Sequence, residues 1–187
     1  GLVGSEMCIR DSFRTLWNFT RQRFTSVDEK DILAQGEFIS SMLVSLYLKE
    51  QGINNRLLNS LDFMRLAPEE EPDMEYIGTK LHLLLAEHKS TNVFLTQGHL
   101  CRNAYNETCY LKQGGDDVSA TLIGAALQAQ EVCLWTDSKK LHSCDPRFMK
   151  HPAMVKQLSF DEAEQLAFYG AKILHPFCIA PARKRNI

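Results

Sequence analysis

Apolar residues recur at the spacing of an α-helix in several parts of the chain. Near its beginning, Phe13, Leu16, Trp17 and Phe24 fall on one face and leave the intervening arginines for solvent. This pattern predicts a helix over 13–24 whose apolar face packs against another element.

A second apolar stripe, from residue 32 to residue 47, predicts a long helix. Ser26 and Glu29 precede it at the spacing of a capping box, in which each side chain accepts a hydrogen bond from the other residue's backbone N–H. Gly52 follows the stripe at a position where glycine commonly ends a helix.

Later stretches alternate between short apolar runs and helical patterns. The runs at 56–58, 92–97 and 131–135 predict strands, although the region around the first of them is also compatible with a short helix. Asp73 predicts the N-cap of an amphipathic helix between the first two runs, after an acidic, proline-containing surface loop. Residues 98–112 predict a loop or hairpin.

The stretch 117–129 is apolar nearly all round, which predicts a buried helix. The order of strand, helix and strand predicts parallel pairing and therefore an α/β sandwich. Ser159 and Glu162 form a second capping-box pattern, for a helix through Ala167, and Gly170 predicts the start of the last element.

Composition excludes several classes of partner. The 187 residues include 21 basic and 23 acidic side chains, so no global field favours nucleic acid or an anionic membrane. No apolar run is long enough for a membrane span and no signal sequence leads the chain, so we expect a cytoplasmic location. The six cysteines show no metal-ligand spacing, and we expect buried free thiols.

The candidate chemistry gathers after a double glycine. Gly114 and Gly115 open the apolar helix, as in a phosphate site at a helix N-terminus, although a plain tight turn explains the pattern equally well. Four charged residues follow, which could serve phosphoryl transfer with Mg²⁺ or only ordinary caps and ion pairs. They are Asp117, Asp137, Arg147 and Lys172. For His142 and His175, packing or hydrogen bonding explains the pattern better than acid–base catalysis.

Several segments resemble the aspartate kinases of the amino-acid kinase superfamily. They are GGDDVSATLIGAALQA, EVCLWTD, CDPRF, LSFDEAEQLAFYGAKILHP, AQGEFISS and FLTQG, spread over 31–181. The wording LDFMRLAPEEEPDMEYI and the Leu-His at His142 are most similar to Bacteroidetes members. The resemblance implies a three-layer α/β/α sandwich of the carbamate kinase-like type. It also implies transfer of the ATP γ-phosphate to the β-carboxylate of L-aspartate with Mg²⁺, the first step toward lysine, threonine and methionine, in a parent that is a homo-oligomer.

The same resemblance assigns site residues. Gly36, Glu37 and Gln113 would bind the substrate, and Asp117 and Lys172 would be catalytic. The nucleotide would be bound by residues from three motifs and the glycine turn: Gly114, Gly115, Thr136, Asp137, His142, Arg147 and Lys172. No resident metal ligand is assigned.

The chain departs from the family pattern beside the glycine turn. Gln113 replaces an arginine, Asp116 replaces a serine, Lys139-Lys140 replace Asp-Gly, and His99 replaces a phenylalanine. These changes motivate an alternative, a degenerate homologue that serves as an association module. Another amino-acid kinase, such as a glutamate or uridylate kinase, is the second alternative, which the WTD, DPR and GAKILHP wording disfavours.

The ends of the chain complete the expectations. Residues 1–12 resemble a translated sequencing adaptor, so we expect them to be non-native and disordered, and 13–187 to be a partial catalytic domain. The family's N-terminal strand with its Lys-Phe-Gly-Gly-Thr-Ser motif and the regulatory ACT domains have no counterpart here. An incomplete sheet exposes an edge, so the isolated polypeptide is predicted to be unstable and inactive.

Overall fold

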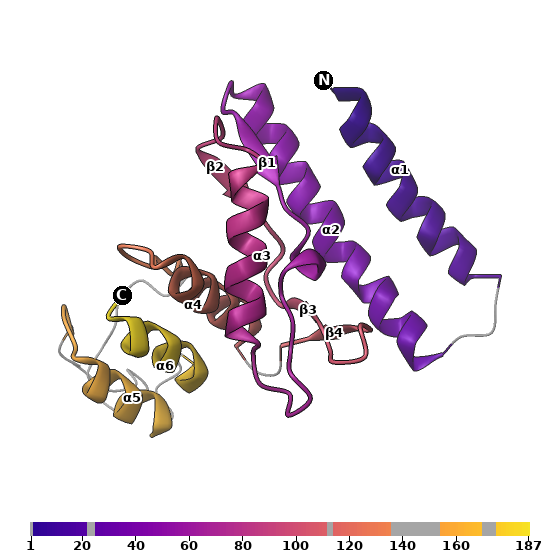
Figure 1. Cartoon of the computed structure of the whole chain (residues 1–187). Coiled ribbons are helices and arrows are strands. Elements are labelled where there is room, and N and C mark those ends of the chain that lie inside the picture. The colour runs from indigo at the N-terminus through magenta and orange to yellow at the C-terminus, as the bar shows by residue number, and fades with distance from the viewer. Residues whose placement is uncertain (1, 22–24, 112–113, 136–153, 170–174) are drawn as a thin grey trace. The chain divides into compact units, whose positions relative to one another are not determined.

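The computed structural model describes residues 2–21, 25–111, 114–135, 154–169 and 175–187. The chain divides into two compact units, Gly1–Tyr110 and Leu111–Ile187 (Figure 1). The first unit contains α1 (Leu2–Phe19), α2 (Ser26–Glu50), β1 (Asn55–Leu57), the 3₁₀ helix η1 (Ser60–Asp62), α3 (Met74–Ala86), β2 (Val93–Leu95), β3 (Leu100–Arg102) and β4 (Thr108–Tyr110). The second contains α4 (Gly115–Leu127), α5 (Phe160–Phe168) and α6 (Pro176–Arg185).

Helix α1 lies along α2 (Figure 1). The predicted packing face is wrong in part, because Phe13 and Trp17 are exposed and Ser12 is buried instead. The helix begins at Leu2, within the segment 1–12 that was expected to be non-native and disordered, an expectation that stays a prediction. Once a helix has nucleated, each added residue gains a hydrogen bond, and extension toward the N-terminus costs little. The helix ends at Phe19 and is followed by a turn, so it ends earlier than the predicted range 13–24.

The N-cap of α2 lies one residue earlier than predicted. Thr25, not Ser26, is the N-cap, and it forms the capping box with Asp28 rather than Glu29. The Asp28 N–H donates to Thr25 Oγ1 at 3.2 Å, and the Thr25 N–H donates to Asp28 Oδ2 at 2.8 Å. Both pairs have the same spacing, so the sequence pattern could not distinguish them. Gly52 follows the helix with φ +76°, as expected for a glycine that ends a helix.

Strands β1 and β2 are parallel and α3 connects them, which confirms the predicted strand–helix–strand order. Their register pairs Asn55 with Val93 and Leu57 with Leu95. The first strand starts one residue before its predicted position because buried Asn55 is satisfied by α2. The Ser45 hydroxyl donates to Asn55 Oδ1 at 2.6 Å, and Asn55 Nδ2 donates to the Ser45 carbonyl at 3.1 Å.

The core of the first unit gathers under α3 and η1. Asp73 caps α3 as predicted, by accepting from the Tyr76 N–H at 3.1 Å. The largest fully buried apolar side chains of this unit are Phe63, Met64, Ile77, Leu81 and Leu100.

Strands β3 and β4 form an antiparallel hairpin, which resolves the expectation of a loop or hairpin over 98–112. Its turn is held by Asn103, whose side-chain oxygen accepts from the Tyr105 and Glu107 N–H groups, each at 2.9 Å. Asn106 adopts the left-handed conformation, with φ +64°, that asparagine tolerates better than most residues.

In the second unit, α4 is buried along much of its length, as predicted. The strand predicted at 131–135 is wrong, because these residues have no regular secondary structure. A strand needs a hydrogen-bonding partner, and the described part of this unit contains no strand. Instead the segment returns against α4, where Val132 Cγ2 would lie 2.4 Å from a Cβ on Gly124.

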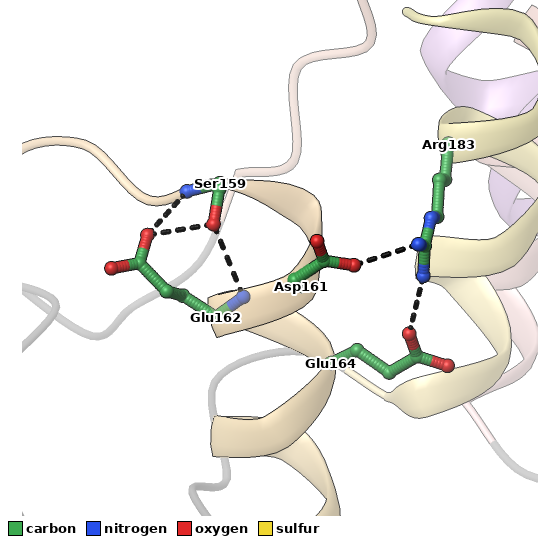
Figure 2. Close-up of polar contacts among 5 residues, drawn as sticks. All are labelled: Ser159, Asp161, Glu162, Glu164 and Arg183. Carbon is green, nitrogen blue, oxygen red and sulfur yellow. Dashed lines mark hydrogen bonds and ion pairs between the residues drawn. The ribbon is translucent and has the colours of Figure 1, made fainter.

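The last two helices pack together. The capping box of Ser159 and Glu162 on α5 is confirmed, and Figure 2 shows Arg183 of α6 reaching two carboxylates of α5. Arg183 contacts Asp161 at 2.7 Å and Glu164 at 2.8 Å. The predicted start of the last element, Gly170–Lys172, lies outside the described residues.

Two further expectations concern thiols and membranes. Cys101, Cys109 and Cys178 are buried free thiols as predicted, whereas Cys133 is exposed because its segment is not a strand. The side chains of Cys8 and Cys144 are outside the description. Among the described helices, none has both the length and the apolar character needed to cross a bilayer.

Candidate functional site

The glycine turn opens α4, as the sequence predicted. Gly114 is the N-cap in the left-handed conformation, with φ +66°, and Gly115 is the buried first residue of the helix. The first amides of a helix have no acceptor within it and carry a partial positive charge, so this end can hold an anion. Asp116 and Asp117 occupy the same first turn and place two carboxylates beside it.

A second helix begins at the same place. A Cβ on Gly114 would lie 2.5 Å from the Cβ of His175, which is the N-cap of α6. Burial, followed by the nearby Asp117 carboxylate, raises the pKa of Cys178 in the first turn of α6. The Gly114–His175 approach and the effect of Asp117 on Cys178 both show that the N-termini of α4 and α6 lie close together. The positive ends of the two helix dipoles therefore lie at the same place.

Glu37 lies on α2 in the first unit, one turn before a buried polar network. Its carbonyl accepts from the Ser41 hydroxyl at 2.8 Å. Gln97 then joins α2 to η1, because its Nε2 donates to Ser41 Oγ at 2.7 Å and its Oε1 accepts from the Ser60 N–H at 2.9 Å. The loop after β2 is therefore fixed to the helix that carries Glu37. Gly36 is exposed, and nothing lies within 4 Å of where a Cβ would be.

Tyr110 adds a titratable group near Glu37. Its hydroxyl donates to the Lys30 carbonyl at 2.8 Å, and its ring lies against His99, with centroids 5.4 Å apart. Burial, followed by the negative charges of Asp31 and Glu37, raises the pKa of Tyr110. The negative charge of Glu37 therefore contributes to the raised pKa of Tyr110, the last residue of β4.

The second unit also contains an apolar pocket of about 560 Å³ between α4, α5 and α6. Its walls include Thr121, Leu134, Phe160 and Ile179. Such a lining suits a hydrophobic group and not a phosphate. Among the described residues, no group of three or more His, Cys, Asp or Glu side chains could form a metal site.

The remaining predicted site residues lie outside the described residues. They are Gln113, Thr136, Asp137, His142, Arg147 and Lys172. The structure places the others in two groups, one in each unit: Gly36 and Glu37 on α2, and Gly114, Gly115 and Asp117 at the start of α4.

Two residues that the sequence reasoning did not assign to the site have clear structural roles there. Gln97 holds the loop after β2 through its hydrogen bonds to Ser41 and Ser60. It is the glutamine of the FLTQG segment, one of the segments that carry the family resemblance. His175 was expected to serve packing or hydrogen bonding. The structure agrees, because its Nδ1 accepts from the Phe177 N–H at 3.3 Å. Its Cβ also packs so close to Gly114 that a side chain at position 114 would clash with it.

The family model described as "Amino acid kinase family" matches residues 6–187. The chain belongs to the amino acid kinase family. Its mixed helices and strands are those of a partial α/β domain of that fold, which confirms the predicted fold class.

Similar proteins come from several organisms. The aspartokinase of Chlamydia muridarum is 31% identical over 167 residues, which cover 86% of this chain and 37% of that protein. Lysine-sensitive aspartokinase 3 of Escherichia coli is 29% identical over 160 residues, covering 84% of this chain and 36% of the relative. The chain therefore spans well under half the length of these relatives.

Solved structures give the same family. The crystal structure of E. coli aspartokinase III in complex with aspartate and ADP has a TM-score of 0.82 and 28% identity, over 95% of this chain and 42% of that one. The Clostridium acetobutylicum aspartate kinase has a TM-score of 0.70 at 21% identity over 83% of this chain and 34% of that one, which supports the fold alone.

Proposed function

We propose that the chain is part of an aspartate kinase that uses ATP to phosphorylate the β-carboxylate of L-aspartate. The observation that carries this proposal is the likeness to E. coli aspartokinase III in complex with aspartate and ADP, over 95% of this chain. The meeting of two helix N-termini at Gly114 supports it, because phosphoryl transfer depends mainly on positioning and charge stabilisation.

The glycine turn would bind the phosphates. Gly114 has no side chain between the α4 amides and a ligand, so bound phosphates would meet backbone N–H groups of α4. The start of α6 lies against Gly114 and would contribute through its helix dipole, because Pro176 has no N–H and the Phe177 N–H donates to His175. From the resemblance, Lys172 and Arg147 would add cations, and Thr136, Asp137 and His142 would contact the nucleotide.

Asp117 fits Mg²⁺ as a partner of bound phosphates, since Mg²⁺ usually takes one or two carboxylates and completes its shell with phosphate and water. When bound, the ion would neutralise charge on the transferring group. Glu37 and Gly36 would position L-aspartate from α2, in a homo-oligomeric, cytoplasmic parent of Bacteroidetes type. The non-native origin of residues 1–12 also remains a proposal.

Binding of ADP by the 187-residue chain is the direct test, measured by competition with a fluorescent ADP analogue. We expect saturable binding that ATP displaces. A chain that is folded by circular dichroism and binds no ADP would contradict the nucleotide assignment. That outcome would favour the association module, for which the second carboxylate, Asp116, at the α4 N-terminus is the specific observation.

L-Aspartate binding is tested by restoring a cation. Gln113→Arg supplies a guanidinium that can bind a carboxylate in bidentate fashion, so we expect L-aspartate to bind at least about tenfold more tightly. In that background, Glu37→Gln should weaken binding, while Glu50→Gln at the far end of α2 should not. Equal effects of the two glutamine variants would remove Glu37 from the substrate site.

Gly36→Ala separates structure from substrate contact. The position is helical and unobstructed, so alanine should stabilise α2 by about 1 kcal/mol. If Gly36 contacts L-aspartate, the same variant loses affinity despite its greater stability. Unchanged affinity would show that Gly36 has no role in binding.

A further inference from the structure

Two thiols face each other across the β3–β4 hairpin. Cys101 and Cys109 are register partners, and their sulfur atoms lie 3.1 Å apart in a hydrogen-bonding contact. No role is assigned to either residue by the site described above. Both residues are free cysteines in this structure, with no covalent bond between their sulfur atoms.

The backbone geometry suits a covalent bond. The Asn103 N–H donates to the Glu107 carbonyl at 3.0 Å, and opposed pairs in an antiparallel ladder alternate between two types. Cys101 and Cys109 lie two residues further along each strand and therefore form the same hydrogen-bonded type, with Cα atoms about 5.5 Å apart. Disulfides span Cα separations of about 4.4–6.8 Å, so the pair lies within that range, and bond formation requires the sulfur atoms to close from 3.1 Å to about 2.05 Å.

The two thiols are not equivalent. Cys101 is fully buried on β3, which is held by the Arg102 N–H donating to the Met64 carbonyl at 2.9 Å. Cys109 lies on β4 and keeps 8% of its surface exposed. The hydrogen bond from Cys101, together with the positive charges of Lys30 and Arg102, lowers the pKa of Cys109. Cys109 is thus the more exposed residue of the pair and the one whose pKa is lowered.

We propose that Cys101 and Cys109 are a redox-active thiol pair that a peroxide oxidises to a reversible cross-strand disulfide. The Cys109 thiolate attacks one oxygen of hydrogen peroxide, the O–O bond breaks, and the leaving hydroxide takes up the proton of Cys109 to become water. The resulting Cys109 sulfenic acid is attacked by the Cys101 sulfur. The S–O bond breaks, and hydroxide leaves with the Cys101 proton as a second water.

The electrons balance in this sequence, since two thiols lose two electrons and the peroxide gains two. A dithiol reductant reverses the bond by exchange. The disulfide would covalently close the hairpin that lies in sequence between Gln97 and the Gly114 turn.

Tryptic mapping of the full chain tests the pair directly. Trypsin cleaves after Lys89, Arg102 and Lys112, so the two cysteines fall in different peptides, 90–102 and 103–112. After peroxide treatment, alkylation of remaining thiols and a non-reducing digest, we expect these peptides to be linked, with a mass two hydrogens below their sum. Dithiothreitol should separate them. Recovery of both peptides alkylated, or of Cys109 as a sulfinic acid without a link, would overturn the proposal.

Two controls separate a built pair from random oxidation. The same treatment in urea should give mixed pairings among the six cysteines, whereas the folded chain should give the 101–109 link predominantly. In Cys101→Ser, which lacks the second thiol, Cys109 should accumulate as a sulfenic acid that dimedone labels, while Cys133→Ser should still form the link. Loss of the link in Cys133→Ser would show that the exposed thiol carries the reaction.

Discussion

Replacing Gly114 by alanine changes two features of the glycine turn at once. The residue has φ +66°, a conformation that side chains disfavour, and its Cβ would lie 2.5 Å from the Cβ and 2.6 Å from the Cγ of His175. Gly52 provides a matched control, because it has φ +76° but nothing within 4 Å of its Cβ position. The comparison separates backbone strain, which both variants share, from the contact between the starts of α4 and α6.

The left-handed conformation costs an L-residue roughly 1–2 kcal/mol, so Gly52→Ala should lose about that much. At Gly114 the clashing atoms lie at the base of the His175 side chain, so the backbone must move. Overpacking of this kind adds roughly 1–3 kcal/mol, for a total of roughly 2–5 kcal/mol. The overpacking free energy of roughly 1–3 kcal/mol corresponds to a roughly 5- to 150-fold increase in the equilibrium constant for local opening of α4.

Amide hydrogen exchange followed by mass spectrometry reports each site locally. Exchange of α4 should accelerate in Gly114→Ala by that extra factor, relative to the change at the end of α2 in Gly52→Ala. Adding His175→Gly to Gly114→Ala removes the clashing atoms while keeping a residue that tolerates the N-cap position, so it should recover the overpacking share only. Equal effects of the two alanine variants, or no recovery in the double variant, would refute the contact with α6.

Three further predictions test charges. The Arg65 hydrogen bond, followed by that of the Tyr76 N–H, lowers the pKa of Asp73, so its stabilisation is present above the unfolded pKa of about 3.9 and is lost as pH falls through the folded pKa. Asp73→Asn should therefore lower the urea midpoint at pH 7 and leave it nearly unchanged at pH 2. Arg183→Ala should lower the free energy of opening of α5 by no more than about 1 kcal/mol, because its ion pairs are half-exposed. Amide hydrogen exchange of α5 should show this loss, and 1 M salt should remove the difference between the variant and the unsubstituted chain. Asp116→Ser should tighten ADP binding in the competition assay by relieving repulsion at the α4 N-terminus, and unchanged affinity would place Asp116 away from the phosphates.

Local signals predicted the elements whose ends are set by their own residues. The Ser159 cap, the Asp73 cap, the Gly52 stop and the Gly114 start depend on hydrogen bonds or φ values within a few residues, and each is confirmed. The cap of α2 failed by one residue because Thr25–Asp28 and Ser26–Glu29 satisfy the same local rule. Choosing between such pairs requires knowledge of where the preceding chain comes from.

Elements that depend on distant partners were not predictable in the same way. The apolar run 131–135 has a strand-like composition, but it has no regular secondary structure, and Val132 packs beside Gly124 of α4. Asn55 is a poor strand former by composition, yet it begins β1 because Ser45, ten residues earlier, satisfies its amide. The position of Gln97 between Ser41 and Ser60 likewise depends on contacts 56 and 37 residues apart along the chain.

The start of α4 shows how stability and function can compete at one place. An N-terminus without a capping side chain is stabilised by acidic residues in its first turn, and Asp116 and Asp117 supply that stabilisation in the unliganded chain. A phosphate bound there would use the same amides and dipole, so the carboxylates that stabilise the helix also oppose the ligand. The approach of α6 changes this balance through its dipole, because α6 has no acidic residue in its own first turn. Its first-turn N–H groups are not available to a ligand, since Pro176 has none and those of Phe177 and Cys178 donate to His175. The favourable potential of α6 is therefore what would allow this turn to bind phosphate despite two neighbouring carboxylates.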